Sequence, residues 1–360
     1  MNTLVWIGFS QALFAAILMI AKNERAVYDK ILTSWLVLLA IDFLTSAIDY
    51  QLFDVPLLSG THLLFNAALY LYVRSLTVAG FRLKYLHLFH LLPFLVFEIM
   101  AYIIREPLLL GDYLVQNENY IFRFSFALTS LVSWLIYSPL SITLVYNYRT
   151  NLQNETSHIE TNENIRWLMS LTTFYVVYCI VGYIISFIVN IMGDHQSMIP
   201  DVYNYSLLLV LVYMLSFYGL RQKHIPEQFQ IQNKKRQYKK PLLSDSDRKA
   251  IGEQVVEYFH RQKAYLNPDL NMDLLSSKLK IPKHQLTEVL NVEIGKSFFQ
   301  LVNFFRVEAV KKMLEDPGNI YSIEAIGYEC GFSNKSSFFK IFKETVGKTP
   351  LEYKKRVSIR

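Results

Sequence analysis

Five ionisable or polar residues interrupt apolar stretches in the N-terminal part of the chain: Asp42, Asp49, His62, Asn66 and Glu98. Asp42 and Asp49 lie one heptad apart and His62 and Asn66 lie four residues apart, so each pair would share one face of a helix. A charge inside a bilayer is costly unless it is paired or hydrated, so these residues are candidates for a ligand-sensing cavity. The alternative is that they hydrogen-bond between helices and only hold a bundle together.

His87 and His90 have the spacing of a metal-binding pair on one helical turn. No third ligand is evident nearby, and histidine rings also suit the edge of a membrane, so we interpret them as interfacial anchors. The two cysteines, Cys179 and Cys330, provide no disulfide framework or cysteine-rich metal site. We find no catalytic constellation, and we expect neither an enzyme nor a bound metal or cofactor.

Charge divides the chain into two parts. Residues 1–220 contain 10 Lys and Arg against 14 Asp and Glu, whereas residues 221–360 contain 26 against 16. A basic C-terminal part indicates a polyanionic partner, and an apolar, slightly acidic N-terminal part indicates lipid as solvent. We therefore predict a transmembrane domain at 1–220, a basic juxtamembrane linker at 221–245 and a soluble domain at 246–360.

Seven stretches are long and apolar enough to span a bilayer as helices, in which each backbone group is satisfied internally. They are Leu4–Ile20, Ile31–Phe53, Pro56–Ala79, Leu86–Ile104, Ile121–Tyr146, Trp167–Met192 and Val202–Leu220. We interpret the first stretch as a span and not as a removed signal peptide, because no basic region precedes it.

The basic residues of the connecting loops predict the orientation. The odd-numbered loops and the tail carry Lys22, Arg25, Lys30, Arg74, Arg82, Lys84, Arg149, Arg166, Arg221 and Lys223. Loops two and six have no Lys or Arg, and in loop four Arg105 is offset by acidic residues. The N-terminus is therefore expected outside and the C-terminus in the cytoplasm.

Five basic residues cluster just beyond the last span: Lys234, Lys235, Arg236, Lys239 and Lys240. Such a cluster favours anionic lipid headgroups by about 1 kcal/mol per charge. It is equally typical of a solvated linker, and the two interpretations are compatible.

Helical periodicity continues from Ser244 to the C-terminus. The pattern predicts helices at Ser246–Ala264, Met272–Leu279, Pro282–Asn291, Phe298–Leu314 and Asn334–Val346, with a further short helix after Ser322 and a terminal one after Thr349. Asp316-Pro317-Gly318 ends the longest of them. Ser322 and Ser333 are expected caps, and Gly331 suits the turn between them. Thr349-Pro350-Leu351-Glu352 is a capping box that opens the terminal helix. Two short pairs of helices, each joined by a tight turn, thus predict two helix-turn-helix units around one connecting helix.

The segment from Ile323 to Tyr353, IEAIGYECGFSNKSSFFKIFKETVGKTPLEY, resembles the signature of AraC/XylS transcription regulators. Gly331-Phe332, the Phe338/Phe342 spacing, Gly347 and Thr349-Pro350 occur together and in order. The first unit departs from that pattern at Ser276 and Pro282. The resemblance covers about the last 110 residues and implies double-stranded DNA as partner, with readers on one face of the duplex about 34 Å apart.

By this resemblance and by expected exposure, we predict groove-facing residues in both units: Lys283, His284 and Thr287 in the first, and Asn334, Lys335, Ser336 and Ser337 in the second. Lys340, Lys343 and Lys348 are better placed for phosphates, which give affinity but no sequence choice. For each lysine alone, a solvated helix face is the alternative.

We therefore predict an all-α protein: a seven-helix transmembrane bundle followed by a cytoplasmic domain with two helix-turn-helix units. The predicted function is a multi-pass transcription regulator of a bacterial cytoplasmic (inner) membrane that couples an unknown small-molecule or envelope signal to gene expression. A homodimer is considered. The alternatives are a transporter or membrane enzyme with a DNA-binding tail, or a passive anchor on a DNA-binding domain.

Overall fold

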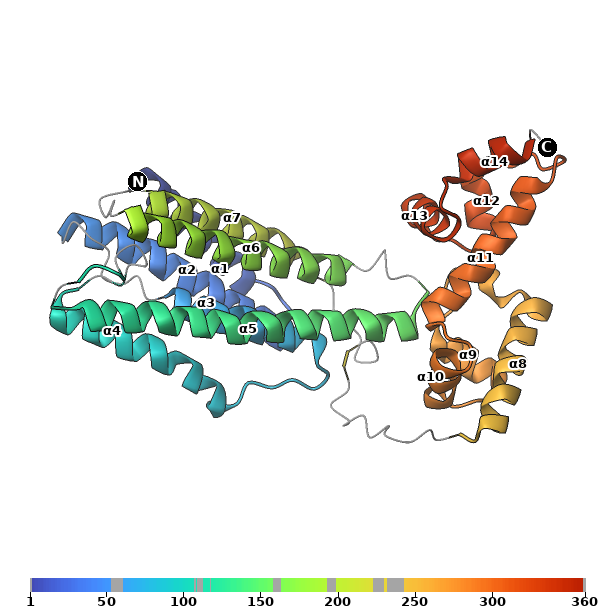
Figure 1. Ribbon diagram of the computed structural model, residues 1–360, viewed down its shortest axis with the longest axis horizontal. Coiled ribbons are helices and arrows are strands. Elements are labelled where there is room, and N and C mark those ends of the chain that lie inside the picture. The colour runs from blue at the N-terminus through green and yellow to red at the C-terminus, as the bar shows by residue number, and fades with distance from the viewer. Residues whose placement is uncertain are drawn as a thin grey trace. The chain divides into compact units, whose positions relative to one another are not determined.

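The structure is a computed structural model that describes residues 2–52, 61–106, 108, 113–116, 118–157, 163–192, 199–222, 230–231 and 243–358. These residues form helices and two isolated backbone bridges (Figure 1). They divide into two compact units, one of residues 1–146 and 166–232 and one of residues 147–165 and 233–360. The predicted all-α class is confirmed.

The N-terminal unit is a bundle of long apolar helices. They are α1 (Asn2–Ile20), α2 (Val27–Leu52), α3 (His62–Thr77), the 3₁₀ helix η1 (Tyr85–Leu91), α4 (Leu92–Ile104), most of α5 (Tyr120–Glu155), α6 (Glu163–Met192) and α7 (Ile199–Arg221). α1 packs against α2 and α7, and α2 packs against α3. Gly8 allows the close approach of α1 to α2, because a Cβ there would lie 2.4 Å from the ring of Phe43.

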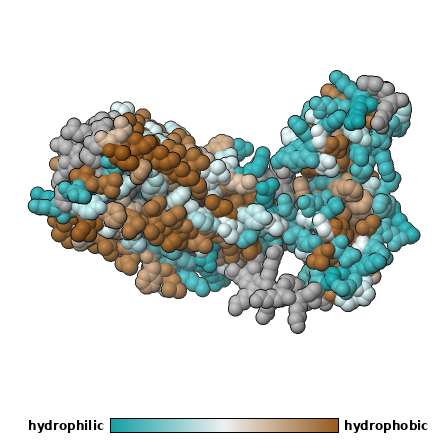
Figure 2. All heavy atoms as spheres, viewed as in Figure 1, coloured by the Kyte–Doolittle hydropathy of each residue, from teal (hydrophilic) through white to brown (hydrophobic). Residues whose placement is uncertain are grey.

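Six helical segments among the described residues are long and apolar enough to cross a membrane. They are Thr3–Ile20, Val27–Asp49, Tyr85–Ile104, Tyr120–Glu155, Asn164–Met192 and Asp201–Arg221. Large hydrophobic side chains remain exposed on several of them, including Phe14, Ile103 and Ile188. In Figure 2 brown, hydrophobic residues cover much of the visible face of this unit. Water is a poor solvent for so continuous an apolar surface.

Three predicted spans differ from the helices observed. The third, Pro56–Ala79, is described as the 16-residue, mostly buried α3, and residues 53–60 lie outside the described residues. The fourth begins as the 3₁₀ helix η1, and Pro93 falls in the first turn of α4, where no helical N–H is lost. α5 continues to Glu155, nine residues beyond the predicted end, because its amphipathic last turns pack in the C-terminal unit.

The described residues of the C-terminal unit form seven α-helices and a short 3₁₀ helix besides the end of α5. They are α8 (Asp245–Gln262), η3 (Ala264–Leu266), α9 (Met272–Leu279), α10 (Lys283–Val292), α11 (Phe298–Glu315), α12 (Ile323–Glu329), α13 (Lys335–Val346) and α14 (Pro350–Ser358). All the helices expected from the sequence are present here, with bounds that move by one or two residues.

Two hydrophobic cores share the single helix α11. The first packs α8, α9 and α10 against the first half of α11, up to Phe305, and includes Phe259 and Leu286. The second packs α12 and α13 against the second half, from Val307, and includes Phe338. Each core therefore belongs to one helix-turn-helix unit, and α11 connects the two.

Candidate nucleic-acid interface

The second helix-turn-helix unit consists of α12 and α13. Ser322 caps α12 by accepting a hydrogen bond from the backbone N–H of Ala325, as predicted. Gly331 forms the turn with φ +89°, and a Cβ there would lie 2.4 Å from the carbonyl oxygen of Tyr265. Gly327 packs directly under the ring of Phe338, which closes α12 onto α13. Only glycine fits these two positions without displacing a neighbour.

The start of α13 differs from the prediction by one residue. Asn334, and not Ser333, is the cap, since its side chain accepts a 2.7 Å hydrogen bond from the N–H of Ser337. Asn and Ser cap helices about equally well, so the sequence alone did not decide between neighbours. Downstream, Thr349 and Glu352 exchange hydrogen bonds with each other's N–H and form the predicted capping box of α14.

The first unit consists of α9 and α10. Asn271 caps α9, and Lys280 ends it in the left-handed conformation with φ +58°. Ser276, which departs from the family pattern, donates a 2.6 Å hydrogen bond to the carbonyl oxygen of Ile281 in the turn. Pro282 occupies the N-cap position of α10, where it offers no side-chain cap. The turn is therefore held by Ser276 in place of a capping side chain at residue 282.

Most of the predicted DNA-contacting residues lie at the surface of the two units. His284, Lys335, Ser336, Lys340, Lys343 and Lys348 are exposed, and Lys283, Thr287 and Asn334 are half-buried. Ser337 is buried, with 6% of its surface exposed, so its expected exposure is wrong. It lies one helical turn before Ile341 on the buried face of α13, so its side chain faces the core. Thr287 Oγ1 donates to the carbonyl oxygen of Lys283 within its own helix.

The first residue of each recognition helix is a lysine paired with carboxylates. Lys283 Nζ lies 2.7 Å from Asp273 Oδ1 and 3.1 Å from Glu155 Oε2. Burial lowers the pKa of Lys283, but the hydrogen bonds to Asp273 and Glu155 outweigh it and hold the pKa above its ordinary value. Lys335 Nζ lies 2.9 Å from Glu324 Oε2, which raises the pKa of Lys335. Both ammonium groups therefore stay charged at neutral pH.

Arg306, on α11 between the two cores, is completely buried. Its Nε donates to the carbonyl oxygen of Tyr265 (2.8 Å) and its Nη2 to that of Asn267 (3.0 Å), both in the segment before α9. The guanidinium also lies 5.8 Å from the ring centre of Phe332, in the turn of the second unit. Burial lowers its pKa to about 10, so it remains protonated. Arg306 thus links both units to α11.

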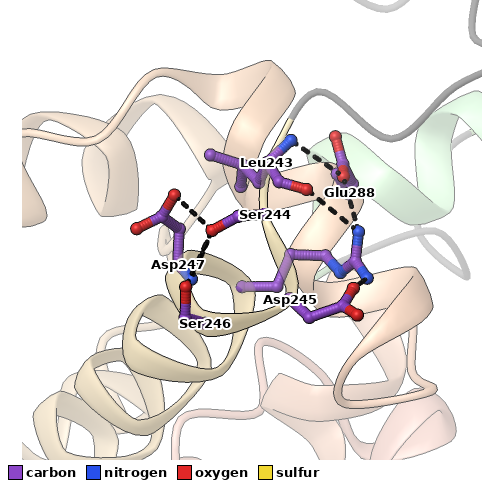
Figure 3. A network of polar contacts seen from close by, with 7 residues as sticks. Leu243, Ser244, Asp245, Ser246, Asp247 and Glu288 are labelled. Atoms are coloured by element: carbon purple, nitrogen blue, oxygen red, sulfur yellow. Dashed lines mark hydrogen bonds and ion pairs between the residues drawn. The ribbon is translucent and has the colours of Figure 1, made fainter.

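A polar network fixes the start of α8 on α10 (Figure 3). Ser244 caps α8 through the N–H of Asp247. Arg248 Nη1 donates to the carbonyl oxygen of Leu243 (3.2 Å) and lies 3.5 Å from Glu288 Oε1 on α10, while the N–H of Leu243 donates to the same carboxylate. The chain therefore enters this domain in contact with the first recognition helix.

The candidate sensing residues lie in the N-terminal unit, where Asp42, Asp49, Asn66 and Glu98 are buried. Thr61 donates to Asp42, and His62 Nε2 lies 2.9 Å from Ser130 Oγ on α5. Asn66 donates to Ser133 on α5 and accepts from Tyr175 on α6. The contacts of His62 and Asn66 connect helices, as the bundle-stabilising alternative expects.

Sequence reasoning did not identify the acidic partners of the interface or the carbonyl acceptors of Arg306. Asp273, Glu324 and Glu155 carry no motif of their own. An arginine within the broad apolar stripe of α11 was a signal for a buried structural role, because a charge on that face must find acceptors inside the domain.

Two short-helix pairs, each with a tight turn and an exposed second helix, define a DNA-binding domain with two helix-turn-helix units. Residues 275–356 match the model of a family described as "Helix-turn-helix domain", of the AraC type. The AraC-type resemblance is thus confirmed for this part of the chain. The presence of this domain supports the binding of double-stranded DNA.

A curated relative carries the same indication. The chain is 27% identical to the "Msm operon regulatory protein" of Streptococcus mutans serotype c over 114 residues, and these residues are 32% of this chain. The match covers 39% of that protein's length. No solved structure matches the chain significantly. Together the domain and the relative support a DNA-binding transcription regulator.

Replacing Arg306 with Met should lower the unfolding free energy of the C-terminal domain by about 2–4 kcal/mol, because the carbonyls of Tyr265 and Asn267 lose their buried donor. The thermal unfolding of the full-length protein in detergent measures this loss. Arg261→Met is the matched control, since Arg261 is exposed and paired only with Glu257; its effect should stay within about 0.5 kcal/mol. Equal unfolding temperatures for the two variants would contradict the role of Arg306.

Proposed function

We propose that this protein is a membrane-bound transcription regulator in which the N-terminal bundle passes a signal to a sequence-specific, cytoplasmic DNA-binding domain. The observation that carries the proposal is the double helix-turn-helix domain, which the match at residues 275–356 assigns to the AraC type. The apolar helices of the N-terminal unit support the membrane assignment by their length and composition. No other activity is needed to account for both units.

For specific DNA binding, we assign one set of surface residues to contacts with base edges and another set to contacts with phosphates. We propose Ser336, with Asn334, Lys335, His284, Thr287 and Lys283, for base-edge or groove contacts. Lys340, Lys343 and Lys348, on or next to the C-terminal part of α13, suit phosphates. Ser337 is left out because it is buried.

Lys343→Gln should weaken binding to all duplexes alike and reduce the salt dependence by about one unit of the log–log slope, because one phosphate contact is lost. Ser336→Ala should instead leave that slope unchanged and relax the preference at one base pair by about 1–3 kcal/mol. Fluorescence anisotropy with a duplex selected from a random pool by the full-length protein measures both effects.

Lys249→Gln on α8 is the control for charge alone, since Lys249 is exposed and lies outside both helix-turn-helix units. The interface would be misplaced if this variant matched Lys343→Gln. If the full-length protein enriched no sequence from the pool, specific DNA binding itself would be refuted.

The membrane orientation rests on the loop charges. A cysteine at Gln116, in the fourth loop, should react with an impermeant maleimide in intact spheroplasts. A cysteine at Asn23, in the first loop, should react only after lysis, because that loop is expected in the cytoplasm. Both positions are exposed, and the wild-type protein, with Cys179 and Cys330 alone, is the control. The reverse labelling pattern, or recovery of the protein in the soluble fraction, would reject this topology.

The sensing role falls on the buried polar residues of the bundle. Asp42→Asn, His62→Gln and Glu98→Gln together should change the set of genes that respond to the protein, because each alters a polar group that a ligand could use. RNA sequencing of a deletion strain complemented with each variant measures this. Ser10→Ala is the control, since that exposed hydroxyl bonds only its own helix. An unchanged response with a normally inserted triple variant would leave the bundle as an anchor.

Contacts of the basic linker with anionic lipid belong to the same proposal. Lys234, Lys235, Arg236, Lys239 and Lys240 lie outside the described residues. The proposed lipid contact is supported by the clustering of these five positive charges, which suits an anionic membrane surface. A homodimer is likewise proposed only as an arrangement that the domain allows.

A further inference from the structure

The two chain segments that enter the C-terminal unit both contact the first recognition helix. One is the α5 segment, which is the end of α5 with Thr156 and Ser157 and belongs to the same compact unit as α8–α14. The other is the segment from Leu243 into α8. The first contacts Lys283 at the start of α10, and the second contacts Glu288 in its middle. The inference drawn from this arrangement rests on the proposed function.

The α5 segment is attached to the first unit by three further contacts. Thr156 forms an antiparallel backbone bridge with Asn271, the cap of α9. Ser157 is buried, and its Oγ donates a 2.9 Å hydrogen bond to the carbonyl oxygen of Leu270. Arg306 Nη2 approaches the same Oγ at 3.4 Å. The segment is therefore docked on the loop before α9 by backbone and side-chain contacts in addition to the pair between Glu155 and Lys283.

The second unit is held differently. α13 packs on α11, α12 and α14, all within the DNA-binding domain. Its first residue, Lys335, pairs with Glu324 of its own unit, and 59% of the Lys335 side chain is exposed. Lys283 is 33% exposed and shares its ammonium with Glu155, which is only 17% exposed. The corresponding lysine is thus less available in the first unit than in the second.

The ammonium of Lys283 can bind a carboxylate or an acceptor group of DNA, but it cannot bind both fully at the same time. The N-terminal residues of a recognition helix are the ones that reach the major groove. We propose that Glu155, at the C-terminal end of α5, competes with DNA for Lys283, so that the first helix-turn-helix unit binds DNA fully only when this ion pair opens. The second unit is not subject to this contact. A movement of α5 therefore changes DNA affinity through the first unit.

Glu155→Gln in the full-length protein tests this directly. The substitution keeps the size of the side chain and removes its charge. We expect the dissociation constant for the selected duplex to fall about fivefold, as for the loss of one partly screened ion pair. The salt dependence of binding should become steeper, because salt no longer helps to open the pair of Lys283 with Glu155, while the pair with Asp273 is present in both proteins. Lys283→Gln should weaken binding more in the Glu155→Gln background than in the wild type.

Glu257→Gln is the matched control. Glu257 forms an exposed ion pair with Arg261 on α8, so this variant makes the same change of net charge away from α10. Its affinity for DNA should equal that of the wild type. The proposal is overturned if Glu155→Gln binds no more tightly than the wild type, or if both variants gain affinity equally.

A disulfide gives an independent test within one folded protein. Thr156 and Asn271 are directly paired across the bridge, a geometry that a disulfide can span. The double variant Thr156→Cys/Asn271→Cys should bind the duplex more weakly when oxidised than when reduced, and each single variant should be insensitive to reductant. Equal affinity in both redox states would show that the docked segment does not oppose DNA binding.

These results separate the inference from the proposed function. If the wild-type protein selects no sequence from a random pool, the proposed function fails, and the competition between Glu155 and DNA for Lys283 fails with it. If it selects one, and neither Glu155→Gln nor the disulfide changes affinity, the regulator remains and the competition at Lys283 is refuted.

Discussion

The DNA-binding domain depends on α11 as a single rigid spacer. Its 18 residues span about 27 Å, and each end is fixed in a different hydrophobic core. Arg306 lies where one core gives way to the other, and its guanidinium satisfies carbonyls from the first unit while it packs near the turn of the second. A buried charge with such fixed acceptors tolerates little displacement. The separation of the two recognition helices is therefore a property of this helix.

Local features of this domain could be predicted from the sequence because each has a local cause. Ser322 and the Thr349/Glu352 capping box act within four residues of their own position, the positive φ of Gly331 belongs to its own turn, and the apolar period of α11 spans one helix. Errors occurred where two local solutions compete, as at Ser333 and Asn334, or where a helix continues past its apolar part, as in α5. Ser337 was misjudged because it lies one turn before Ile341, on the face of α13 that packs in the core.

The long-range pairs could not be predicted in this way. Lys283 and Glu155 are 128 residues apart in the chain, and nothing in the sequence around either of them requires the other. The same holds for Arg306 and Ser157. In the bundle, the polar stripe of His62 and Asn66 indicated that these side chains face other helices, but their partners, Ser130, Ser133 and Tyr175, depend on packing.

The two helix-turn-helix units differ in which residues stabilise them. The second follows the family pattern closely, and its helices are capped by residues of the unit itself, although Gly331 in its turn lies against the backbone of Tyr265 and Leu266. The first replaces the capping side chain of α10 with Pro282 and stabilises its turn through Ser276. It is also the unit whose recognition helix contacts the α5 segment and the start of α8. A unit stabilised partly by segments from outside the motif can respond to their movement. A unit whose helices are capped by its own residues responds less. The departures from the pattern thus lie in the unit that contacts segments from outside the motif.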